Sequence, residues 1–585
     1  MTRGLLTAVL AILGLASLPQ ALADAGSDLQ QLLADERAFT WREDPLAATT
    51  DGVHDYDDRL PRVTPADQAR LAEADRKFLA RLRAIDRAAL PAFDAVSYDL
   101  FEFMMAQRIA FAKYREWRAP LVSDSGFYTS VLLLHDLQSP RTTRDYENYL
   151  ARLRDVPRYF DENIANMRLG IAEGFVLPAE VMPGIASVIA AAQFAKAEDS
   201  PFWVPFARFP DSVPEADRAR LATAGRAAIE QQVLPAYAGF KDFFDQEYRP
   251  AARRSIAATE LPDGRAYYAD LVRYYTTLPD ATPEAIHATG LAEVARIRAE
   301  MEAIVRELGF RGSFDEFLAF LRSDPQFYAK TPEELLRYAA WITREIDGHM
   351  PDYFGRIPRA PYTVTPVPAA FAPNYTAGRY NAGPIGGAGE YWVNTYSLPN
   401  RPLYALPALT LHEAAPGHHT QGALARELEN VPAFRLSFYP HAFGEGWGLY
   451  AEYLGVEMGV YHTPYERFGR LTYEMWRAAR LVVDTGMHAF GWPRERALAF
   501  LKSNTALSEH EIRTEVDRYI AWPGQALAYK TGELRIKALR KHAEEALGDK
   551  FDVRAFHDAV LGQGGVTLPV LEKQVEAYIA RARGS

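Results

Sequence analysis

The segment at residues 404–457 holds the densest set of side chains that could bind a metal ion. In it His412 and Glu413 precede a Pro-Gly pair, which is followed at once by two adjacent histidines, His418 and His419. Without the Pro-Gly pair the segment would read H-E-A-A-H, an arrangement in which two histidines one helical turn apart hold zinc and the glutamate acts as general base. The residue types therefore predict a Zn2+ site with hydrolytic chemistry.

The spacing of these histidines does not suit a straight helix. Zinc-binding histidines on a helix lie four residues apart, about 6 Å along the axis, whereas a straight helix would turn His418 about 120° from His412 and place His419 about 10.5 Å further along. Pro416 cannot donate the helical hydrogen bond and Gly417 tolerates unusual dihedral angles, so we expect a local bulge that restores His418 to the ligand position. The predicted ligands are His412 and His418, and His419 is the alternative ligand or a contact to a ligand or substrate.

Glu413 follows the first predicted ligand directly, where its carboxylate can reach water at the metal without binding the metal. Zinc acidifies such water toward neutrality, so a carboxylate can take its proton and later return it to the leaving amine. The alternative is a glutamate on a helix surface. The position between His412 and His418 favours the general base.

A catalytic zinc needs a third protein ligand and an open fourth position. Glu445 and Glu452 lie seven residues apart on a predicted helix that starts near Gly444, which puts them on one face but about 10 Å apart, so only one can bind the metal. Glu445 has glycines on both sides that allow a close backbone approach, and it is the predicted ligand. Glu452 is the alternate ligand, or orients a ligand histidine, or is solvated or paired with an arginine.

Amphipathic helices must position these residues, because apolar residues recur at three- and four-residue spacing from residue 24 to about residue 352. Thr-Pro-Glu sequences at 282–284 and 331–333 each offer an N-cap, a first-turn proline and an early acid. The clearest predicted helices lie at residues 67–86, 143–174, 216–248, 283–308, 465–487 and 569–583.

Helix-breaking residues crowd the stretch at 356–407, and β-forming residues alternate over 390–396, which predicts one or two short strands. Helices return from residue 410. The expected fold is mainly α, a large helical fold with a small β-sheet or hairpin next to the helix that carries His412 and Glu413; the family resemblance given below implies that this fold is metallopeptidase-like. We expect an N-terminal helical part at 24–355 and a catalytic part at 356–585, both within one continuous domain over 24–585.

The first 23 residues indicate a secretory signal peptide, with Arg3, an apolar run at 5–18 and a small-residue cleavage site at 21–23. The apolar run is shorter than the roughly 20 residues that a membrane span requires, so we expect export to the periplasm or beyond without stable membrane insertion. The chain has no cysteine, which excludes a lipid-modified cysteine and disulfides. A net charge of −11 with no basic, aromatic-interleaved block argues against nucleic acid as a partner.

Three motifs resemble the bacterial domain of unknown function 885 (DUF885) family: HEAAPGHHTQ at 412–421, GEGWGLYAE at 444–452 and YIAWPGQALAYKTG at 519–532. The resemblance covers nearly all of the chain after the signal peptide. That family looks like a branch of the gluzincin-type metallopeptidases, which implies a mostly helical zinc peptidase. The G-E-G-W sequence is similar to the third-ligand motif of zinc aminopeptidases and supports Glu445 over Glu452.

Peptide hydrolysis passes through an oxyanion that needs a hydrogen-bond donor besides the metal. Tyr529 is the first candidate and Tyr519 the second, although buried tyrosines usually only pack and hydrogen-bond. The glycine-rich stretch at 383–394 lacks the Gly-Lys-Ser/Thr ending of a phosphate loop. We interpret it as a turn and an edge strand beside the cleft, where a peptide could pair with the backbone, or as an ordinary hairpin. Gly387, Tyr391 and His419 are the predicted substrate contacts.

The sequence thus favours a secreted or periplasmic zinc peptidase that acts on short peptides. One rival is a non-catalytic peptide-binding or scaffold protein with a structural metal; another is a metal-dependent hydrolase of a non-peptide amide or ester. An intact Glu413 beside the histidines argues against the first rival. The sequence leaves the cleaved end, the side-chain preference and the oligomeric state open.

Overall fold

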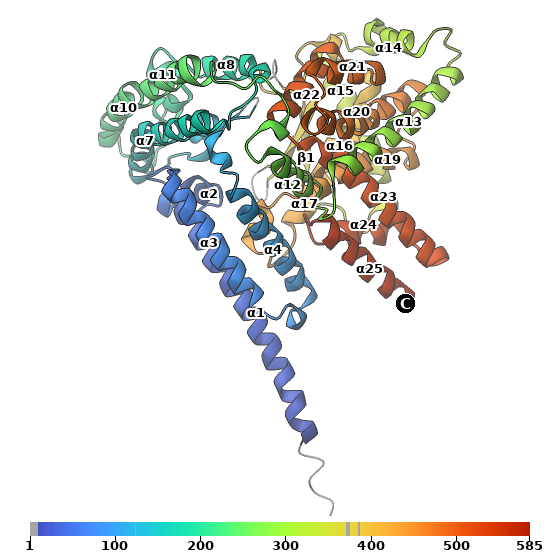
Figure 1. Ribbon diagram of the computed structural model, residues 1–585, viewed down its shortest axis with the longest axis horizontal. Helices are drawn as coiled ribbons and strands as arrows, with labels where there is room; N and C mark the ends of the chain where they lie inside the picture. The colour runs from blue at the N-terminus through green and yellow to red at the C-terminus, as the bar shows by residue number, and fades with distance from the viewer. Residues whose placement is uncertain (1–9, 123–124, 370–371, 373–374, 384–386, 585) are drawn as a thin grey trace, which may run out of the picture. The chain divides into compact units, whose positions relative to one another are not determined.

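The computed structural model describes residues 10–122, 125–369, 372, 375–383 and 387–584 (Figure 1). Its contacts divide the chain into two compact units, Met1–Gly264 and Arg265–Ser585. Within the described residues the fold is mainly α-helical with one small three-stranded mixed sheet, which confirms the predicted fold class.

Side-chain caps mark the starts of α2, α3 and α7 in the first unit. Thr64 and Thr142 accept hydrogen bonds from the amides three residues later, which satisfies a donor that has no partner inside the helix. Phe127, Phe160 and Phe240 meet edge to face in its core, with ring centroids 4.9–6.0 Å apart. The α-helices are α1 (Leu10–Glu43), α2 (Pro45–Thr50), α3 (Pro65–Arg83), α4 (Ala92–Ala112), α5 (Phe127–Leu132), α6 (Leu134–Leu137), α7 (Thr143–Glu173), α8 (Met182–Ala191), α9 (Val204–Ala207), α10 (Glu215–Ala228) and α11 (Leu234–Phe243).

Helix α1 runs through the predicted signal-peptide cleavage site, and residues 1–9 lie outside the described part. No helix among the described residues combines the length and apolar composition that a bilayer crossing needs. The signal peptide and its cleavage stay predictions.

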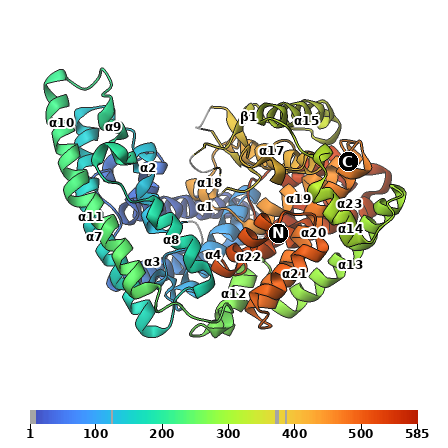
Figure 2. The ribbon, with the colours of Figure 1, turned by 90° about the horizontal axis from the view of Figure 1, so that it is seen from above.

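The second unit contains the metal-competent segment. Its α-helices are α12 (Gly264–Thr276), α13 (Pro283–Glu307), α14 (Phe314–Ser323), α15 (Pro332–Tyr353), α16 (Leu406–Glu413), α17 (His418–Arg426), α18 (Ala433–Ser437), α19 (His441–Glu457), α20 (Pro464–His488), α21 (Arg494–Asn504), α22 (Glu509–Ala521), α23 (Ala528–Leu547), α24 (Val553–Leu561) and α25 (Leu568–Gly584). Helix α20 packs along α13, and α19 packs along α23; α19, α20 and α23 lie side by side (Figure 2). Gly290 allows the first close approach, because a β-carbon there would stand 2.7 Å from Leu481 Cβ.

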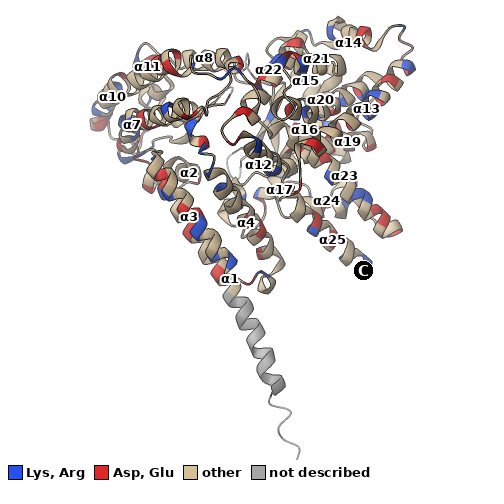
Figure 3. Ribbon diagram, in the orientation of Figure 1, with Lys and Arg blue, Asp and Glu red and all other residues tan. Residues whose placement is uncertain are grey.

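The predicted boundary between the N-terminal helical part and the catalytic part, at residue 356, falls inside the second unit, which begins at Arg265. The reason is long-range packing: α13 and α15 precede residue 356, yet α13 packs on α20 and α15 packs on α16. Along the helices of both units acidic and basic residues are interspersed (Figure 3). Many form pairs one turn apart, such as Arg158 with Asp155 and Arg298 with Glu302.

The sheet has the strand order β1-β3-β2, with β1 (Tyr362–Pro366), β2 (Gly378–Asn381) and β3 (Gly389–Val393). Strand β3 pairs in parallel with β1 and antiparallel with β2. The prediction of an edge strand within the glycine-rich stretch at 383–394 is therefore wrong, because both sides of β3 are already paired. The edge strand near the metal-competent segment is β2, which packs on α16. Pro384–Gly386 of the glycine-rich stretch lie outside the described residues.

Candidate metal centre

Three side chains from three helices converge in the second unit: His412 of α16, His418 of α17 and Glu445 of α19. One ligand atom from each lies within 4.8 Å of the other two. Glu445 Oε2 is 3.7 Å from His412 Nε2 and 3.4 Å from His418 Nε2. Atoms about 2.0–2.2 Å from a tetrahedral zinc lie roughly 3.4 Å apart. The observed separations therefore fit a group that can hold a metal ion of this size.

A break between two helices, rather than a bulge within one, brings the histidines together. Helix α16 ends at Glu413 and α17 begins at His418, with the Pro-Gly pair between them. The Trp447 indole donates a hydrogen bond of 2.8 Å to the Pro416 carbonyl and anchors the break to α19. Because the chain changes direction here, His418 joins the group, and the ring centroids of His412 and His418 are 4.8 Å apart.

Glycines remove atoms where the helices approach most closely. A β-carbon on Gly448 would stand 2.7–2.9 Å from the His412 ring, and one on Gly446 would meet the backbone of α23 at 2.5 Å. Gly417 lies against the end of α16, since its β-carbon would stand 1.9 Å from the His412 carbonyl. The G-E-G-W-G sequence is thus a surface on which α16 and α23 fit against α19.

Glu452 orients the first histidine from behind. Its Oε1 lies 2.8 Å from His412 Nδ1, so Nε2 of the same ring is turned toward Glu445 and His418. The same oxygen is 3.4 Å from an Arg477 nitrogen. A carboxylate in this position fixes the orientation of a ligand histidine and raises its basicity. The structure therefore places Glu452 behind His412, outside the three-residue group.

The electrostatics of the group favour positive charge at its centre. Burial by itself would lower the pKa of His412, but the carboxylates of Glu445 and Glu452 outweigh it and raise the pKa to about 10. Burial would likewise raise the pKa of Glu445, yet His412 and His418 hold it well below its usual value. A metal ion would supply the same positive charge while leaving both histidines neutral.

Glu413 lies beside this group and is held by the sheet. Its Oε2 accepts a 2.8 Å hydrogen bond from the Tyr380 amide of β2. Glu413, His412, His418 and Glu445 all line one cavity of about 510 Å³. Strand β2 and helices α16, α17, α19, α20, α22 and α23 contribute to its walls.

Comparison with known proteins agrees with this architecture. The family described as "Bacterial protein of unknown function (DUF885)" matches residues 45–575. The chain belongs to the DUF885 family. A crystal structure of a "putative lipoprotein" from Colwellia psychrerythraea is similar, with 27% identity, a TM-score of 0.87, and coverage of 95% of this chain and 99% of that one.

A second solved structure, described as a "putative lipoprotein of unknown function" from Shewanella oneidensis, shares the fold of this DUF885 protein. Its TM-score is 0.73 at 17% identity, over 94% of this chain and 99% of the other. No curated protein matches the chain. The relationship to gluzincin peptidases stays a prediction.

Of the two tyrosines predicted to donate to an oxyanion, this DUF885 protein places Tyr529 on the cavity wall. The Tyr519 side chain is buried elsewhere, and its hydroxyl is already committed. It donates to Glu515 at 2.6 Å and accepts from Trp476 at 2.9 Å and Arg480 at 2.8 Å. Tyr519 therefore supports the wall from behind.

The residues predicted to contact substrate lie away from the metal group. The His419 ring packs on Tyr362 with centroids 4.3 Å apart, and its Nδ1 lies 3.2 Å from the Tyr380 hydroxyl. Burial lowers the pKa of His419 to about 4. Tyr391 is fully buried with its hydroxyl 3.3 Å from Thr410 Oγ1, and Gly387 forms a bend just before β3. None of the three lines the described walls of the metal cavity.

Several cavity residues were not predicted from the sequence. Tyr439 covers Gly444, since a β-carbon on that glycine would stand 2.3 Å from the Tyr439 hydroxyl oxygen. Arg477 and Arg480 line the cavity from α20, where they look like ordinary helix arginines in the sequence. The helix is buried on all sides, so its apolar residues surround both arginines in the sequence. Those apolar neighbours were the signal that could have identified the two arginines as buried.

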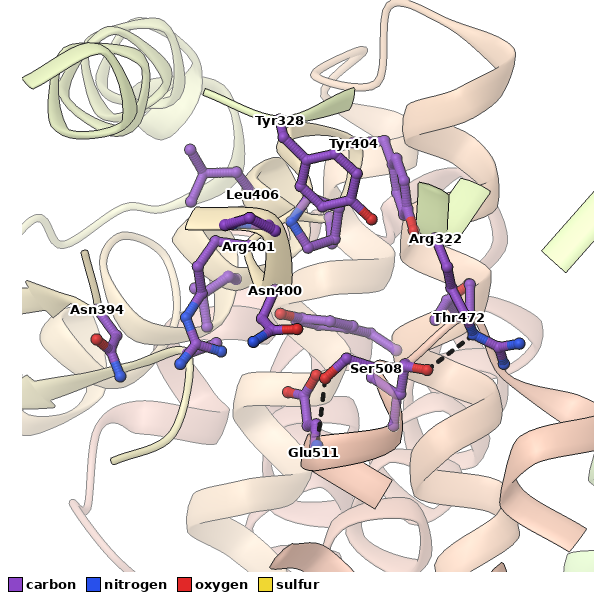
Figure 4. Close-up of a pocket in the computed structure, with 18 of the residues that line it drawn as sticks. Arg322, Tyr328, Asn394, Asn400, Arg401, Tyr404, Leu406, Thr472, Ser508 and Glu511 are labelled. Atoms are coloured by element: carbon purple, nitrogen blue, oxygen red, sulfur yellow. Dashed lines mark hydrogen bonds between the residues drawn. The ribbon is translucent and has the colours of Figure 1, made fainter. Parts of the chain in front are cut away.

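A second cavity of about 250 Å³ adjoins the first, and the two share Ala377, Leu409 and Tyr473 in their walls. Figure 4 shows Arg401 and Glu511 among the side chains that surround it. Burial raises the pKa of Glu511 to about 7, against the opposing effect of Arg401. The adjoining cavity holds no part of the metal group.

Proposed function

We propose that the protein is an exported zinc-dependent peptidase that hydrolyses short peptides. The observation that carries the proposal is the convergence of His412, His418 and Glu445 in one cavity with Glu413. Two histidines and one glutamate are a common ligand set of catalytic zinc sites, which leave the fourth position for water or substrate. The family description leaves the activity open, so the proposal rests on the site.

Zinc in this group would polarise the scissile carbonyl and lower the pKa of water beside it. The Glu413 carboxylate is held at Oε2 by the Tyr380 amide, which orients it for proton transfer. In the proposed reaction Glu413 takes a proton from the attacking water and delivers it to the nitrogen of the leaving amine. Proton transfer by a positioned carboxylate replaces transfer through bulk solvent.

Two further residues would support the same step. Glu452 keeps His412 Nε2 directed at the centre, because it occupies Nδ1 at 2.8 Å. Tyr529 lines the cavity, and in the proposed reaction its hydroxyl would donate a hydrogen bond to the oxyanion of the tetrahedral intermediate. In both roles the residue positions a group of the reaction, so it would raise the rate of hydrolysis and leave the reaction mechanism the same.

The proposed location is the periplasm or the extracellular space. The N-terminal sequence has the features of a signal peptide, and the two similar solved proteins are described as putative lipoproteins. This chain has no cysteine that could carry a lipid, so we propose export without such an anchor.

Digestion of a mixed peptide library tests the proposal. Purified protein is analysed for bound metal and then incubated with the library, with and without a chelator. We expect one zinc per chain, cleavage that chelation abolishes and zinc restores, and loss of cleavage in Glu413→Gln. Glu429→Gln, which changes an exposed glutamate outside the cavity, is the matched control and should cleave normally.

Stoichiometric zinc with no cleaved peptide would overturn the peptidase assignment. In that case a panel of non-peptide amides and esters distinguishes a different hydrolase from a protein that only binds peptides. Cleavage that survives chelation and the Glu413→Gln change would place the reaction elsewhere in the chain.

A further inference from the structure

The wall of the metal cavity formed by α20 contains two buried arginines, Arg477 and Arg480. Their residues are 4% and 2% exposed. Within the described part of the chain, Arg477 Nε and Arg480 Nη1 have no hydrogen-bond partner. A buried donor that lacks a partner is costly, and more so on a charged group. Such a donor on the wall of a cavity is a mark of a group that a ligand completes.

The charges on this wall do not balance. Arg480 pairs with Glu515 at 2.8 Å, but Arg518 lies 3.5 Å from the same carboxylate. Among the described residues the one carboxylate within ion-pair distance of Arg477 is that of Glu452, at 3.4 Å, and it also contacts His412. Within ion-pair distance, three guanidinium groups therefore share two carboxylates, and Glu452 also contacts His412 of the metal group. The positive charges of these ion pairs exceed the negative charges by one, so a bound anion could balance them.

Aromatic rings hold the two arginines in place. The guanidinium carbons of Arg477 and Arg480 lie 4.2 and 4.4 Å from the centroid of the Trp476 ring. The Arg480 guanidinium also lies 4.2 Å from the Tyr529 ring centroid. A guanidinium stacked in this way keeps its orientation, so little entropy is lost when it binds a ligand.

The wall stands close to the metal group. Arg477 contacts Glu452, and Glu452 contacts His412, so only one side chain separates the first arginine from a predicted ligand. Arg480 follows one turn later on the same face of α20. A peptide whose scissile bond lies at the metal group could therefore reach this wall with a group only a few residues away from that bond.

We propose that the wall formed by Arg477, Arg480 and Arg518 binds a carboxylate of the ligand that enters the cavity. This inference rests on the proposed function in naming that ligand as a short peptide. The planar guanidinium fork matches a carboxylate, and a charged hydrogen bond in a buried site is stronger than a neutral one. The carboxylate is the peptide's C-terminus or the side chain of an Asp or Glu close to the bond to be cleaved.

Binding to the Glu413→Gln protein, measured by calorimetry, tests the inference without requiring hydrolysis. The first arm compares Ala-Ala-Phe with its C-terminal amide. The second arm compares amidated Ala-Glu-Phe with amidated Ala-Gln-Phe. In at least one arm we expect the carboxylate-bearing peptide to bind about ten-fold more tightly, as one buried charged hydrogen bond allows. The arm that shows the preference identifies the source of the carboxylate.

Two controls separate the arginine wall from the metal. The preference should persist after zinc is removed with a chelator, because the arginines and not the metal carry it. It should fall to about two-fold or less in Arg477→Lys and Arg480→Lys, since lysine cannot form the fork. Arg470→Lys is the matched control on the same helix: this buried arginine pairs with Glu474 and does not line the cavity, so the preference should stay.

Equal binding of acid and neutral peptides in both arms would overturn the inference, as would a preference that chelation abolishes or that Arg480→Lys leaves intact. If a lysine variant fails to fold, the comparison of acid and neutral peptides on the Glu413→Gln protein still decides whether the cavity prefers a carboxylate. Hydrolysis of peptides without any carboxylate preference would leave the proposed function standing and remove only this inference. Carboxylate binding without hydrolysis would do the reverse.

Discussion

Helix α20 contributes to two groups of buried charges, and the ion pairs are complete in one group and incomplete in the other. Beside its N-terminal half, Lys530 of α23 is fully buried, with Glu293, Glu474 and Glu533 at 3.0, 2.8 and 2.7 Å. Arg296 and Arg470 also pair with Glu474 in this network. Lys537 pairs with Glu533, and Glu300 pairs with Arg296, so four cations face four carboxylates there. On the cavity wall, Arg477 and Arg480 of α20 and Arg518 of α22 share two carboxylates within ion-pair distance.

The contrast shows how the same residue types serve two purposes. In the network every charge has opposite charges within ion-pair distance, so its burial is compensated within the chain. On the wall the compensation is incomplete, although Arg477 and Arg480 are as deeply buried as the side chains of the network. We infer that the network fixes the packing of α13, α20 and α23, whereas the wall and the metal group are built to be completed by ligands. Changes in the two groups should therefore have different consequences.

The largest effect is expected from Glu413→Gln. The amide keeps the size of the side chain but cannot take a proton, so kcat/KM for peptide cleavage should fall by about 10³-fold, or about 4 kcal/mol of transition-state stabilisation. Zinc content and the midpoint of thermal unfolding should stay as in the unchanged protein. A variant that loses zinc or stability together with activity would contradict a role confined to proton transfer.

A change in the network around Lys530 should lower stability and leave zinc binding intact. Lys530→Met removes the shared cation and leaves three carboxylates buried together, which should lower the free energy of unfolding by about 3 kcal/mol. Urea unfolding followed by circular dichroism measures the loss. Lys541→Met changes an exposed lysine on the same helix and should have little effect. Folded Lys530→Met protein should still bind zinc; loss of zinc with unchanged stability would break the distinction between the two groups.

A third buried charge on α20, Asp484, sharpens the comparison through pH. It accepts from the Tyr268 hydroxyl and the Gly524 amide, and burial raises its pKa to about 7 from the usual 3.8. The folded chain therefore keeps this proton at a pH where the unfolded chain has released it. The stability from Asp484 is present below about pH 4 and is lost as the pH rises through 7, by about 2 kcal/mol between pH 5 and 7.

Asp484→Asn should remove that part of the pH dependence. The measurement is the difference in unfolding free energy between the unchanged protein and the variant across pH 5–8, which isolates Asp484 from other titrating groups. A difference that stays constant over this range would show that Asp484 is ionised in the folded protein.

The smallest effect is expected from Glu452→Gln, at the link between the wall and the metal group. The amide can still contact His412 but no longer carries the charge that raises its basicity, so zinc should bind about ten-fold more weakly. Competition with a chromogenic chelator measures the affinity. Glu457→Gln, on the exposed side of the same helix, is the matched control. Unchanged zinc affinity in Glu452→Gln would mean that the negative charge of the carboxylate does not contribute to metal binding.

Local sequence determined most of the helices and the composition of the metal group. Threonine caps followed by Pro-Glu mark the starts of α13 and α15, and those helices begin where the sequence predicts. His412, His418 and Glu445 could be chosen because metal chemistry restricts the residue types and helical geometry restricts the spacing. Both kinds of information act over a few residues, which is the range that a sequence pattern encodes.

Tertiary structure decided which side chains share a cavity. The helix break faces His418 inward and packs His419 on Tyr362, and the pairing of β3 on both sides leaves β2 as the free edge. Tyr519 and Tyr529 are ten residues apart and look alike in the sequence, but Arg480 and Glu515 occupy the hydroxyl of the first. These outcomes depend on contacts between residues far apart in the chain, and no local periodicity records them. The arginine wall is of this kind: its missing negative charge becomes visible only once every neighbour of Arg477 and Arg480 is in place.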